Sequence, residues 1–258
     1  MTTSSRPRRK KSLGQCFLED RNILRLEADL ADPGGRTILE IGAGDGRLTE
    51  IILSKSPKKL FAVEKDPHFA SLLREKFHGK AEIIEGDFLE MKVPKVDVIV
   101  GNIPYYISSD IIFKLKDSDF SHAVLMVQKE FAQKMTANPG EKNYGRLSVT
   151  SQLSFNIKLE RAVPKHLFRP VPEVHSAIIT LSPTSFKPDT FQEDVIRSIF
   201  QHKNKTVRNA LLDSKLFAKD DLGVLGAYEE KRGRELSKEQ CLEIAGLLKN
   251  LKKLRALP

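Results

Sequence analysis

Ile38-Leu-Glu-Ile-Gly-Ala-Gly-Asp-Gly46 is a short apolar run that leads directly into a turn with three glycines. The run has the length and composition of a buried strand. Glycines at 42, 44 and 46 let the backbone bend sharply and approach a ligand closely. Their spacing is GxGxG, not the GxGxxG of dinucleotide-binding turns, so a pyrophosphate is not the favoured ligand here.

On both sides of this turn, short apolar runs alternate with stretches of helical periodicity. Runs of strand length lie at Ile38–Ile41, Leu60–Val63, Ala81–Ile84, Val96–Val100 and Ala123–Val127. Helical patterns lie at Leu48–Leu53, Phe69–Phe77 and Ile111–Leu115, and Asp20 is expected to cap a helix through about Ala31. This alternation predicts an α/β domain with a parallel sheet covered on both faces. Two later runs, Lys158–Val163 and Ser176–Leu181, are expected to form an antiparallel hairpin at the sheet edge.

The pattern changes after Ser182-Pro-Thr-Ser and is helical from Thr190 onward. Thr190-Phe-Gln-Glu193 and Ser237-Lys-Glu-Gln240 have the form of capping boxes that open apolar-periodic segments. We therefore expect three parts: a basic, disordered arm at 1–11, an α/β domain at 12–183 and a small helical domain at 184–258.

The charge of the chain is concentrated at its two ends. In total, 43 Lys+Arg against 34 Asp+Glu give a net charge of +9. Residues 1–11 carry +5, residues 12–182 are neutral and residues 183–258 carry +4. Such a surplus favours a polyanionic partner, either nucleic acid or an anionic membrane surface.

The sequence favours no disulfide framework, metal site or membrane span. Its two cysteines, Cys16 and Cys241, lie in no metal-ligand spacing, and its six histidines are scattered. No apolar run approaches the roughly 18 residues that a membrane span needs, and no apolar segment follows the basic N-terminus. We expect a soluble cytoplasmic protein without a bound metal.

Two carboxylates follow the next apolar runs after the glycine turn. Glu64 ends the run Phe-Ala-Val-Glu, where a carboxylate can accept both hydrogen bonds of a ribose diol. Asp87, in Glu-Gly-Asp-Phe, could accept from an adenine amino group. Each signal alone is compatible with a purely structural role, but their order indicates an adenosine-containing cofactor. Because no phosphate-binding lysine follows the turn, S-adenosylmethionine is favoured, with Lys65 and Phe88 as neighbouring candidates.

The motif Asn102-Ile-Pro-Tyr105 follows the fourth run and carries the chemistry. The exocyclic amine of adenine is a poor nucleophile because its lone pair is delocalised into the ring. If the Asn102 side-chain oxygen and the Ile103 carbonyl accept its two hydrogens, the lone pair is freed to attack a sulfonium methyl. Pro104 fixes the backbone, and Tyr105 offers a face on which a base stacks. The alternative, a proline turn with aromatic filler, is disfavoured by the preceding motifs, which indicate methylation of an adenine or cytosine amine.

With these motifs, the sequence resembles the KsgA-type ribosomal RNA adenine N6,N6-dimethyltransferases over roughly residues 10–258. Lys-Ser-Leu-Gly-Gln-Cys-Phe-Leu (11–18) is similar to the family's opening motif, and Phe168-Arg-Pro-Val-Pro-Glu-Val-His-Ser176 to its late motif. The resemblance implies a Rossmann-like class I S-adenosylmethionine-dependent methyltransferase fold with a small C-terminal all-helical, RNA-binding domain.

The resemblance also implies roles for individual residues. Cofactor contacts fall on Gln15, Cys16, Leu18, Gly42, Gly44, Glu64, Lys65, Asp87, Phe88 and Asn102. The target base would be held by Tyr105 and Phe168. RNA would be bound by Arg8, Arg9, Lys10, Lys11, Lys203, Lys205 and Arg208. Cys16 stands where members usually carry Asn or His, and a thiol is only a weak donor.

The implied activity is transfer of methyl groups from S-adenosylmethionine to N6 of two adjacent adenosines in the 3′-terminal hairpin of small-subunit rRNA. The expected partner is the immature small ribosomal subunit, and we expect a monomer. Two alternatives stay open at this point. One is a large-subunit rRNA dimethyltransferase of the antibiotic-resistance kind, which shares these motifs. The other is a ribosome-assembly or RNA-binding factor in which methylation is dispensable.

Overall fold

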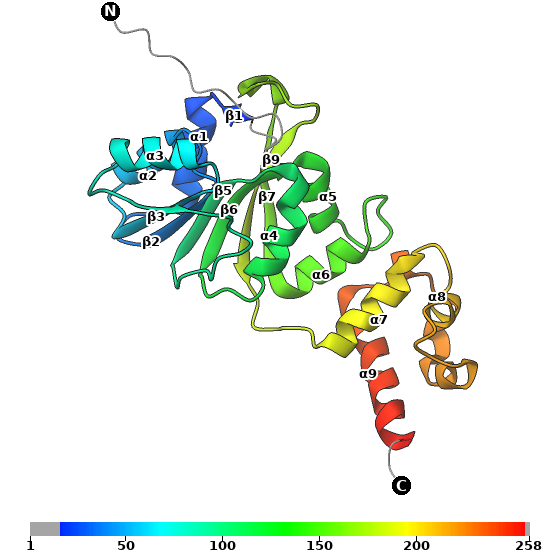
Figure 1. Ribbon diagram of the computed structural model, residues 1–258. Coiled ribbons are helices and arrows are strands. Elements are labelled where there is room, and N and C mark those ends of the chain that lie inside the picture. The colour runs from blue at the N-terminus through cyan, green and yellow to red at the C-terminus, as the bar shows by residue number, and fades with distance from the viewer. Residues whose placement is uncertain (1–15, 256–258) are drawn as a thin grey trace, which may run out of the picture. The chain divides into compact units, whose positions relative to one another are not determined.

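The computed structural model describes residues 16–255, with side chains described through residue 251 (Figure 1). The expected arm 1–11, with Arg8, Arg9, Lys10 and Lys11, lies outside the described residues, as does Gln15. The chain divides into two compact units. The first comprises Met1–Lys129 and Leu159–Leu181, and the second comprises Glu130–Lys158 and Ser182–Pro258.

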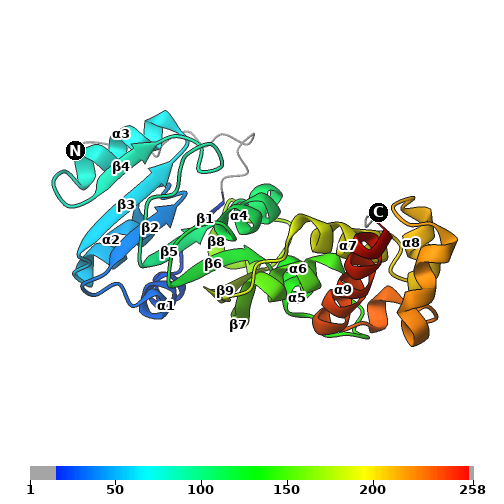
Figure 2. The same cartoon turned by 90° about the horizontal axis from the view of Figure 1, so that it is seen from below.

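Among the described residues, seven strands form one sheet in the order β4-β3-β2-β5-β6-β9-β7. In chain order they are β2 (Thr37–Ile41), β3 (Lys59–Glu64), β4 (Glu82–Glu85), β5 (Val98–Asn102), β6 (His122–Gln128), β7 (Phe155–Val163) and β9 (Ser176–Pro183). Strands β4, β3, β2, β5 and β6 are parallel and lie side by side (Figure 2). They coincide with the five predicted apolar runs to within two residues at each end, which confirms the predicted α/β fold.

The helices that accompany these strands begin and end close to their predicted bounds. They are α1 (Arg21–Ala31), α2 (Arg47–Ser54), α3 (Pro67–Lys76) and α4 (Ser108–Leu115). Asp20 caps α1 as expected, because its side chain accepts hydrogen bonds from the backbone nitrogens of Asn22 and Ile23 at 2.8 and 3.1 Å. The apolar face of α1 joins a core with strand residues such as Val98 and Val124.

The end of the sheet differs in one detail from the expected edge hairpin. Strand β9 does not lie at the edge: it pairs antiparallel with β6, Leu125 opposite Ile179, and β7 is the edge strand beyond it. The segment between β7 and β9 contains a short helix, η3 (Lys165–Leu167), and the strand β8 (Phe168–Arg169). Strand β8 pairs with β1 (Phe17–Leu18) in a separate two-stranded sheet, so the connection has a structural role of its own.

The second unit is built from helices around its own apolar core. It contains α5 (Lys129–Thr136), α6 (Arg146–Ser154), α7 (Thr190–Gln201), α8 (Val207–Asp213), η4 (Lys219–Tyr228), η5 (Gly233–Glu235) and α9 (Lys238–Arg255). Its core joins Val149 and Leu153 of α6 to Ile196 of α7 and Ile244 of α9. No helix between residues 16 and 255 is long and apolar enough to cross a membrane.

The division into units differs from the expected boundary at 183/184, because Glu130–Lys158 groups with the C-terminal helices. Tyr144 shows why: its side chain is buried, and its hydroxyl donates to the Leu236 carbonyl at 2.6 Å.

The first of the two predicted capping boxes is shifted by one residue. The cap of α7 is Asp189, paired reciprocally with Gln192, and not Thr190 with Glu193. The second box, Ser237 with Gln240, is confirmed.

Candidate active site

A cavity of about 560 Å³ lies in the first unit at the carboxyl ends of the parallel strands. Strand β2 is the first parallel strand in the chain; β3 and β4 extend the sheet to one side, and β5 and β6 extend it to the other. The order in which strands are added to the sheet therefore reverses between β2 and β5, and open α/β sheets bind ligands in the crevice at such a point. Gly42 follows β2 and Asn102 ends β5, and both line the cavity.

The cavity collects the described members of the predicted catalytic, cofactor and base-binding sets. They are Cys16, Leu18, Gly42, Gly44, Glu64, Lys65, Asp87, Phe88, Asn102, Ile103, Pro104, Tyr105 and Phe168. These residues come from six separate segments of the sequence, and the fold brings them to one place.

The glycine turn needs its glycines for two reasons. Gly42, Gly44 and Gly46 have φ angles of 72°, 55° and 77°, a region that strongly favours glycine. A Cβ on Gly44 would also lie 2.8 Å from a ring carbon of Phe17. The turn is thus shaped so that the opening segment of the chain packs directly upon it.

Glu64 ends β3 and is buried beside this turn. Its Oε2 accepts from the Gly44 nitrogen at 2.7 Å and its Oε1 from the Asp66 nitrogen at 2.8 Å. Burial raises the pKa of the Glu64 carboxyl, and the two backbone hydrogen bonds oppose that rise. Each oxygen keeps a further lone pair, so the fixed carboxylate is still able to accept hydrogen bonds from a ligand.

Asp87 follows β4 and is held by two partners. Its Oδ1 accepts from the Leu89 nitrogen at 2.9 Å, and its Oδ2 accepts from Lys65 Nζ at 2.6 Å. The Lys65 ammonium is the main reason that the pKa of the Asp87 carboxyl is lowered. Lys65 is therefore placed to orient Asp87. The next residue, Phe88, is buried in the cavity wall.

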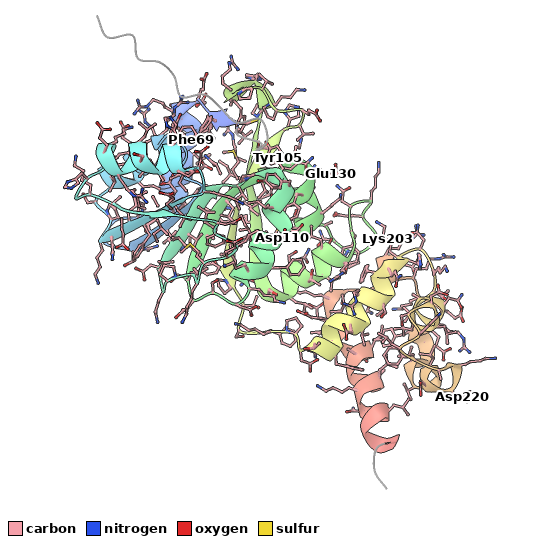
Figure 3. All side chains as sticks on the ribbon, in the orientation of Figure 1. Phe69, Tyr105, Asp110, Glu130, Lys203 and Asp220 are labelled. Carbon is pink, nitrogen blue, oxygen red and sulfur yellow. The ribbon has the colours of Figure 1, made fainter. Side chains whose placement is uncertain are left out.

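The motif Asn102–Tyr105 carries β5 into the helical turn η2 (Tyr105–Ile107). The Ile103 nitrogen donates to the Met126 carbonyl at 3.1 Å, which ties the motif to β6. The Tyr105 hydroxyl and the Ser176 Oγ are 2.6 Å apart, which ties the ring to the start of β9 (Figure 3). Burial raises the pKa of Tyr105, so its hydroxyl stays protonated and orients the ring.

The opening and late motifs meet although some 150 residues separate them. Phe17 lies opposite Arg169 and Leu18 opposite Phe168, and the Glu19 nitrogen donates to the Leu167 carbonyl at 2.9 Å. Leu18 and Phe168 are buried and both line the cavity. The pairing of β1 with β8 therefore builds the wall that carries the residues expected at the cofactor and at the base.

Several cavity residues were not singled out by the sequence. Glu40 lies in the middle of β2 and lines the cavity, and burial raises its pKa to about 8. Its Oε2 has no hydrogen-bond partner among the described residues. Tyr106 and Val171 line the cavity and are 63% and 51% exposed, as expected of a rim that contacts a large substrate. Two features of the sequence could have pointed to such residues: the acidic Glu40 within an apolar strand, and Tyr106 directly after Tyr105.

The three described cations of the predicted RNA-binding set belong to the second unit and are not among the residues that line the cavity; Figure 3 labels one of them, Lys203. Lys203 Nζ donates to the Tyr144 carbonyl at 2.8 Å and to the Lys142 carbonyl at 3.2 Å. Lys205 pairs with Asp213 at 2.6 Å, and Arg208 pairs with Glu229. Each of these side chains has a structural partner within its own unit. The ion pairs of Lys205 and Arg208 reduce the charge that they offer to a nucleic acid, whereas the carbonyl partners of Lys203 leave its charge intact.

The sheet order, the glycine turn and the cavity at the strand ends define a Rossmann-like methyltransferase fold. Two solved structures support this class over nearly the whole chain. A dimethyladenosine transferase from Plasmodium falciparum is 29% identical with a TM-score of 0.83, and covers 92% of this chain and 98% of its own. The 23S rRNA methyltransferase ErmE is 27% identical with a TM-score of 0.70, and covers 90% of this chain and 99% of its own.

The family model described as ribosomal RNA adenine dimethylase matches residues 6–250. The chain therefore belongs to the ribosomal RNA adenine dimethylase family, which confirms the resemblance and the enzyme class that the motifs indicated.

Two curated relatives carry the name "Probable ribosomal RNA small subunit methyltransferase A". The one from Thermococcus onnurineus is 40% identical over 257 residues, which cover 94% of this chain and 93% of the relative. The one from Methanopyrus kandleri is 42% identical over 250 residues, which cover 93% of this chain and 84% of the relative.

Proposed function

We propose that this enzyme transfers methyl groups from S-adenosylmethionine to N6 of two adjacent adenosines in the 3′-terminal hairpin of small-subunit rRNA. The observation that carries the proposal is the place of Asn102–Tyr105: the motif lines one cavity together with Glu64 and Asp87. Its substrate is the maturing small ribosomal subunit in the cytoplasm, and it acts as a monomer.

The residues around the cavity suit S-adenosylmethionine. Glu64 suits a ribose diol because its two oxygens are fixed by backbone nitrogens and retain acceptor capacity. Asp87 suits an adenine amino group, with Phe88 beside it as an apolar wall. Glu40 has a buried oxygen with no hydrogen-bond partner in the part of the chain that the structure describes, and a positively charged ligand would stabilise its ionised form. Bound S-adenosylmethionine supplies a methyl group on a positively charged sulfur.

Asn102 and Ile103 prepare the target amine. The Asn102 Oδ1 and the Ile103 carbonyl accept its two hydrogens, so that the nitrogen lone pair is available for attack. The ring of Tyr105 provides a stacking face, worth about 1–3 kcal/mol per base in nucleic-acid complexes. No strong base is needed, since catalysis follows mainly from positioning the amine for attack.

The second methylation requires a change at the amine. After the first transfer the nitrogen keeps one hydrogen, so that either Asn102 Oδ1 or the Ile103 carbonyl loses its hydrogen bond. The pocket must also accept the added methyl group. Phe168 is buried in the cavity wall, and Val171 and Tyr106 at its exposed rim can adjust to the larger base.

The choice of the small subunit rests on the relatives. Proteins named for the small subunit are about 40% identical to this chain, whereas ErmE, named for 23S rRNA, is 27% identical. The second unit carries 19 Lys+Arg against 13 Asp+Glu, a net charge of +6 that suits contact with RNA phosphates.

The test is methylation of purified ribosomal particles with labelled S-adenosylmethionine. Immature small subunits are expected to acquire label as N6,N6-dimethyladenosine, and large subunits and their free RNA are expected to stay unlabelled. Label in the large subunit would support the resistance-type alternative. Binding to small subunits with no transfer of label would support an assembly factor in which methylation is dispensable.

A further inference from the structure

Glu27 is a carboxylic acid on the buried face of α1. The other buried residues of this helix are apolar: Ile23, Leu24, Ala28 and Ala31. The side chain of Glu27 is 0% exposed, and it is not among the described residues that line the cavity. Burying a carboxyl group costs folding free energy unless the group is hydrogen-bonded.

The partner of Glu27 is the side chain of Asn102. The amide nitrogen of Asn102 donates to Glu27 Oε1 at 2.5 Å and lies 3.3 Å from Oε2. Ionised Glu27 only accepts hydrogen bonds, so the amide atom that faces the ionised carboxylate is the nitrogen. The amide oxygen of Asn102 then points away from Glu27, and Asn102 itself lines the cavity.

We propose that Glu27 is a positioning residue that holds the Asn102 amide with its oxygen available to the substrate amine. An asparagine amide turned by 180° would present its NH₂ group to the amine, and a donor cannot accept the hydrogens of another donor. Glu27 lies behind Asn102 and touches neither ligand. The inference rests on the proposed function, because it takes Asn102 Oδ1 as an acceptor for the target amine.

The protonation of Glu27 gives this arrangement a pH dependence. Burial is the main cause that raises the pKa of Glu27 to about 8; Asn102 lowers it, and Glu40 on β2 adds to the rise. The other titratable groups on the elements packed against α1 have their own partners. His122 of β6 interacts with the Leu30 and Ala31 carbonyls, and Arg47 of α2 with the Leu18 carbonyl and Asp45.

Neutral Glu27 carries a proton that it can donate to Asn102 Oδ1, which allows the wrong amide orientation. Ionised Glu27 permits only the productive orientation. Because the folded-state pKa is raised, the ionised form predominates above about pH 8 and is lost as the pH falls below that value. We therefore expect the single-turnover transfer rate of the wild type, measured at saturating S-adenosylmethionine, to rise with pH through a midpoint near 8.

The kinetic test compares Glu27→Leu and Glu27→Gln with the wild type in single-turnover methylation of immature small subunits. Leucine has a similar size but cannot accept, and we expect the transfer rate to fall about tenfold at pH 8.5. Glutamine offers both a donor and an acceptor, as neutral Glu27 does, so its rate should lose the pH dependence and equal that of the wild type at low pH, between the rates of the wild type and Glu27→Leu at pH 8.5. KM for both substrates should be unchanged in both variants.

A stability measurement separates positioning from a structural role. Leucine removes the cost of burying a carboxyl but leaves the Asn102 amide nitrogen without that acceptor, so the two effects oppose each other and the melting temperature should change little. A slower Glu27→Leu enzyme with the melting temperature of the wild type would be slow without being unstable. Asp29→Asn is the matched control: it removes a carboxylate two residues away on the exposed face of α1, where Asp29 pairs with Lys55. Its transfer rate should match that of the wild type.

A second readout does not depend on the activity. The side-chain NH₂ resonances of Asn102, assigned by comparison with Asn102→Ala, should shift with pH around a midpoint near 8 in the wild type. In Glu27→Leu this transition should be absent. A wild type that methylates nothing but shows the transition would contradict the proposed function and support the role of Glu27. Unchanged Asn102 resonances together with a full transfer rate in Glu27→Leu would overturn it.

Discussion

Glu64 and Asp87 follow neighbouring strands, but they are held in different ways. Glu64 is buried and bound by two backbone nitrogens, which cannot rearrange without moving the turn. Asp87 is bound by one backbone nitrogen and by the mobile side chain of Lys65. A ligand can therefore displace Lys65 at low cost, since ion pairs of exposed lysines contribute about 0–1 kcal/mol.

Asn102→Ala removes the acceptor on which the proposed chemistry depends. We expect the single-turnover transfer rate to fall by about 10² to 10³, as for the loss of one preorganised hydrogen-bonding group. The affinity for S-adenosylmethionine, measured by calorimetry, should change by less than about tenfold, because Glu64 and Asp87 remain. Asn22→Ala, an exposed asparagine on α1, is the control. A transfer rate near that of the wild type would contradict the mechanism and leave the function in place.

Glu40 predicts a proton linkage for the cofactor. Burial raises its pKa to about 8, so the free enzyme holds a proton there at neutral pH. A cation in the cavity favours the ionised form, and binding should therefore release a proton and become tighter as the pH rises toward 8. Calorimetry between pH 6.5 and 8.5 should show this trend in the wild type and a smaller slope in Glu40→Gln. Equal slopes would contradict it.

The elements around the site fix it by close backbone packing as well as by side chains. Strand β5 packs against β2, with Gly101 opposite Ile41, one residue before the motif Asn102–Tyr105. On the other side, Lys114 of α4 donates to the carbonyls of Leu89 and Met91, and its ammonium lies 5.2 Å above the Phe88 ring. The helix that follows Tyr105 therefore also holds the loop that carries Asp87.

Gly101→Ala should damage the site through the sheet. An alanine Cβ would lie 2.7 Å from the Ile41 carbonyl oxygen, a backbone atom that cannot move aside cheaply. We expect a loss of about 1–3 kcal/mol in the free energy of unfolding, measured by denaturant titration. Gly145→Ala is the control, because no atom lies near its Cβ position and its φ is extended. Equal stability of the two variants would contradict the packing argument.

The two units differ more in net charge than the expected division of the chain suggested. With Glu130–Lys158 assigned to it, the second unit carries +6. The first unit carries +3, and because the arm 1–11 alone supplies +5, the rest of that unit is slightly acidic. A slightly acidic unit suits a positively charged cofactor, and the basic parts suit RNA phosphates.

Replacing the five basic residues of 1–11 by glutamine should weaken RNA binding in a salt-dependent way. If all five contact phosphates, the slope of log K against log[salt] should become shallower by roughly 3.5 to 4.5. The affinity for S-adenosylmethionine should be nearly unchanged. Fluorescence anisotropy with an rRNA hairpin at several salt concentrations measures the slope. An unchanged slope would assign the arm no part in RNA binding.

The sequence predicted the elements and most of the site because periodicity and short motifs are local signals. The five parallel strands, the Asp20 cap and the segment Asn102–Tyr105 all follow from neighbouring residues. Long-range contacts leave no such local signal. The pairing of Phe17 with Arg169, the burial of Tyr144 among C-terminal helices and the hydrogen bond between Glu27 and Asn102 each join distant segments. The sequence likewise did not predict that Lys205 pairs with Asp213 and that Arg208 pairs with Glu229.

The most direct test of the central claim, adenosine N6 dimethylation of small-subunit rRNA directed by Asn102, is a map of that rRNA in a host that lacks this protein. Mass spectrometry should find two adjacent adenosines of the 3′-terminal hairpin unmethylated in that host. Wild-type protein should restore N6,N6-dimethyladenosine at both positions, and Asn102→Ala at neither. Full dimethylation in the host that lacks the protein, or restoration by Asn102→Ala, would contradict the account.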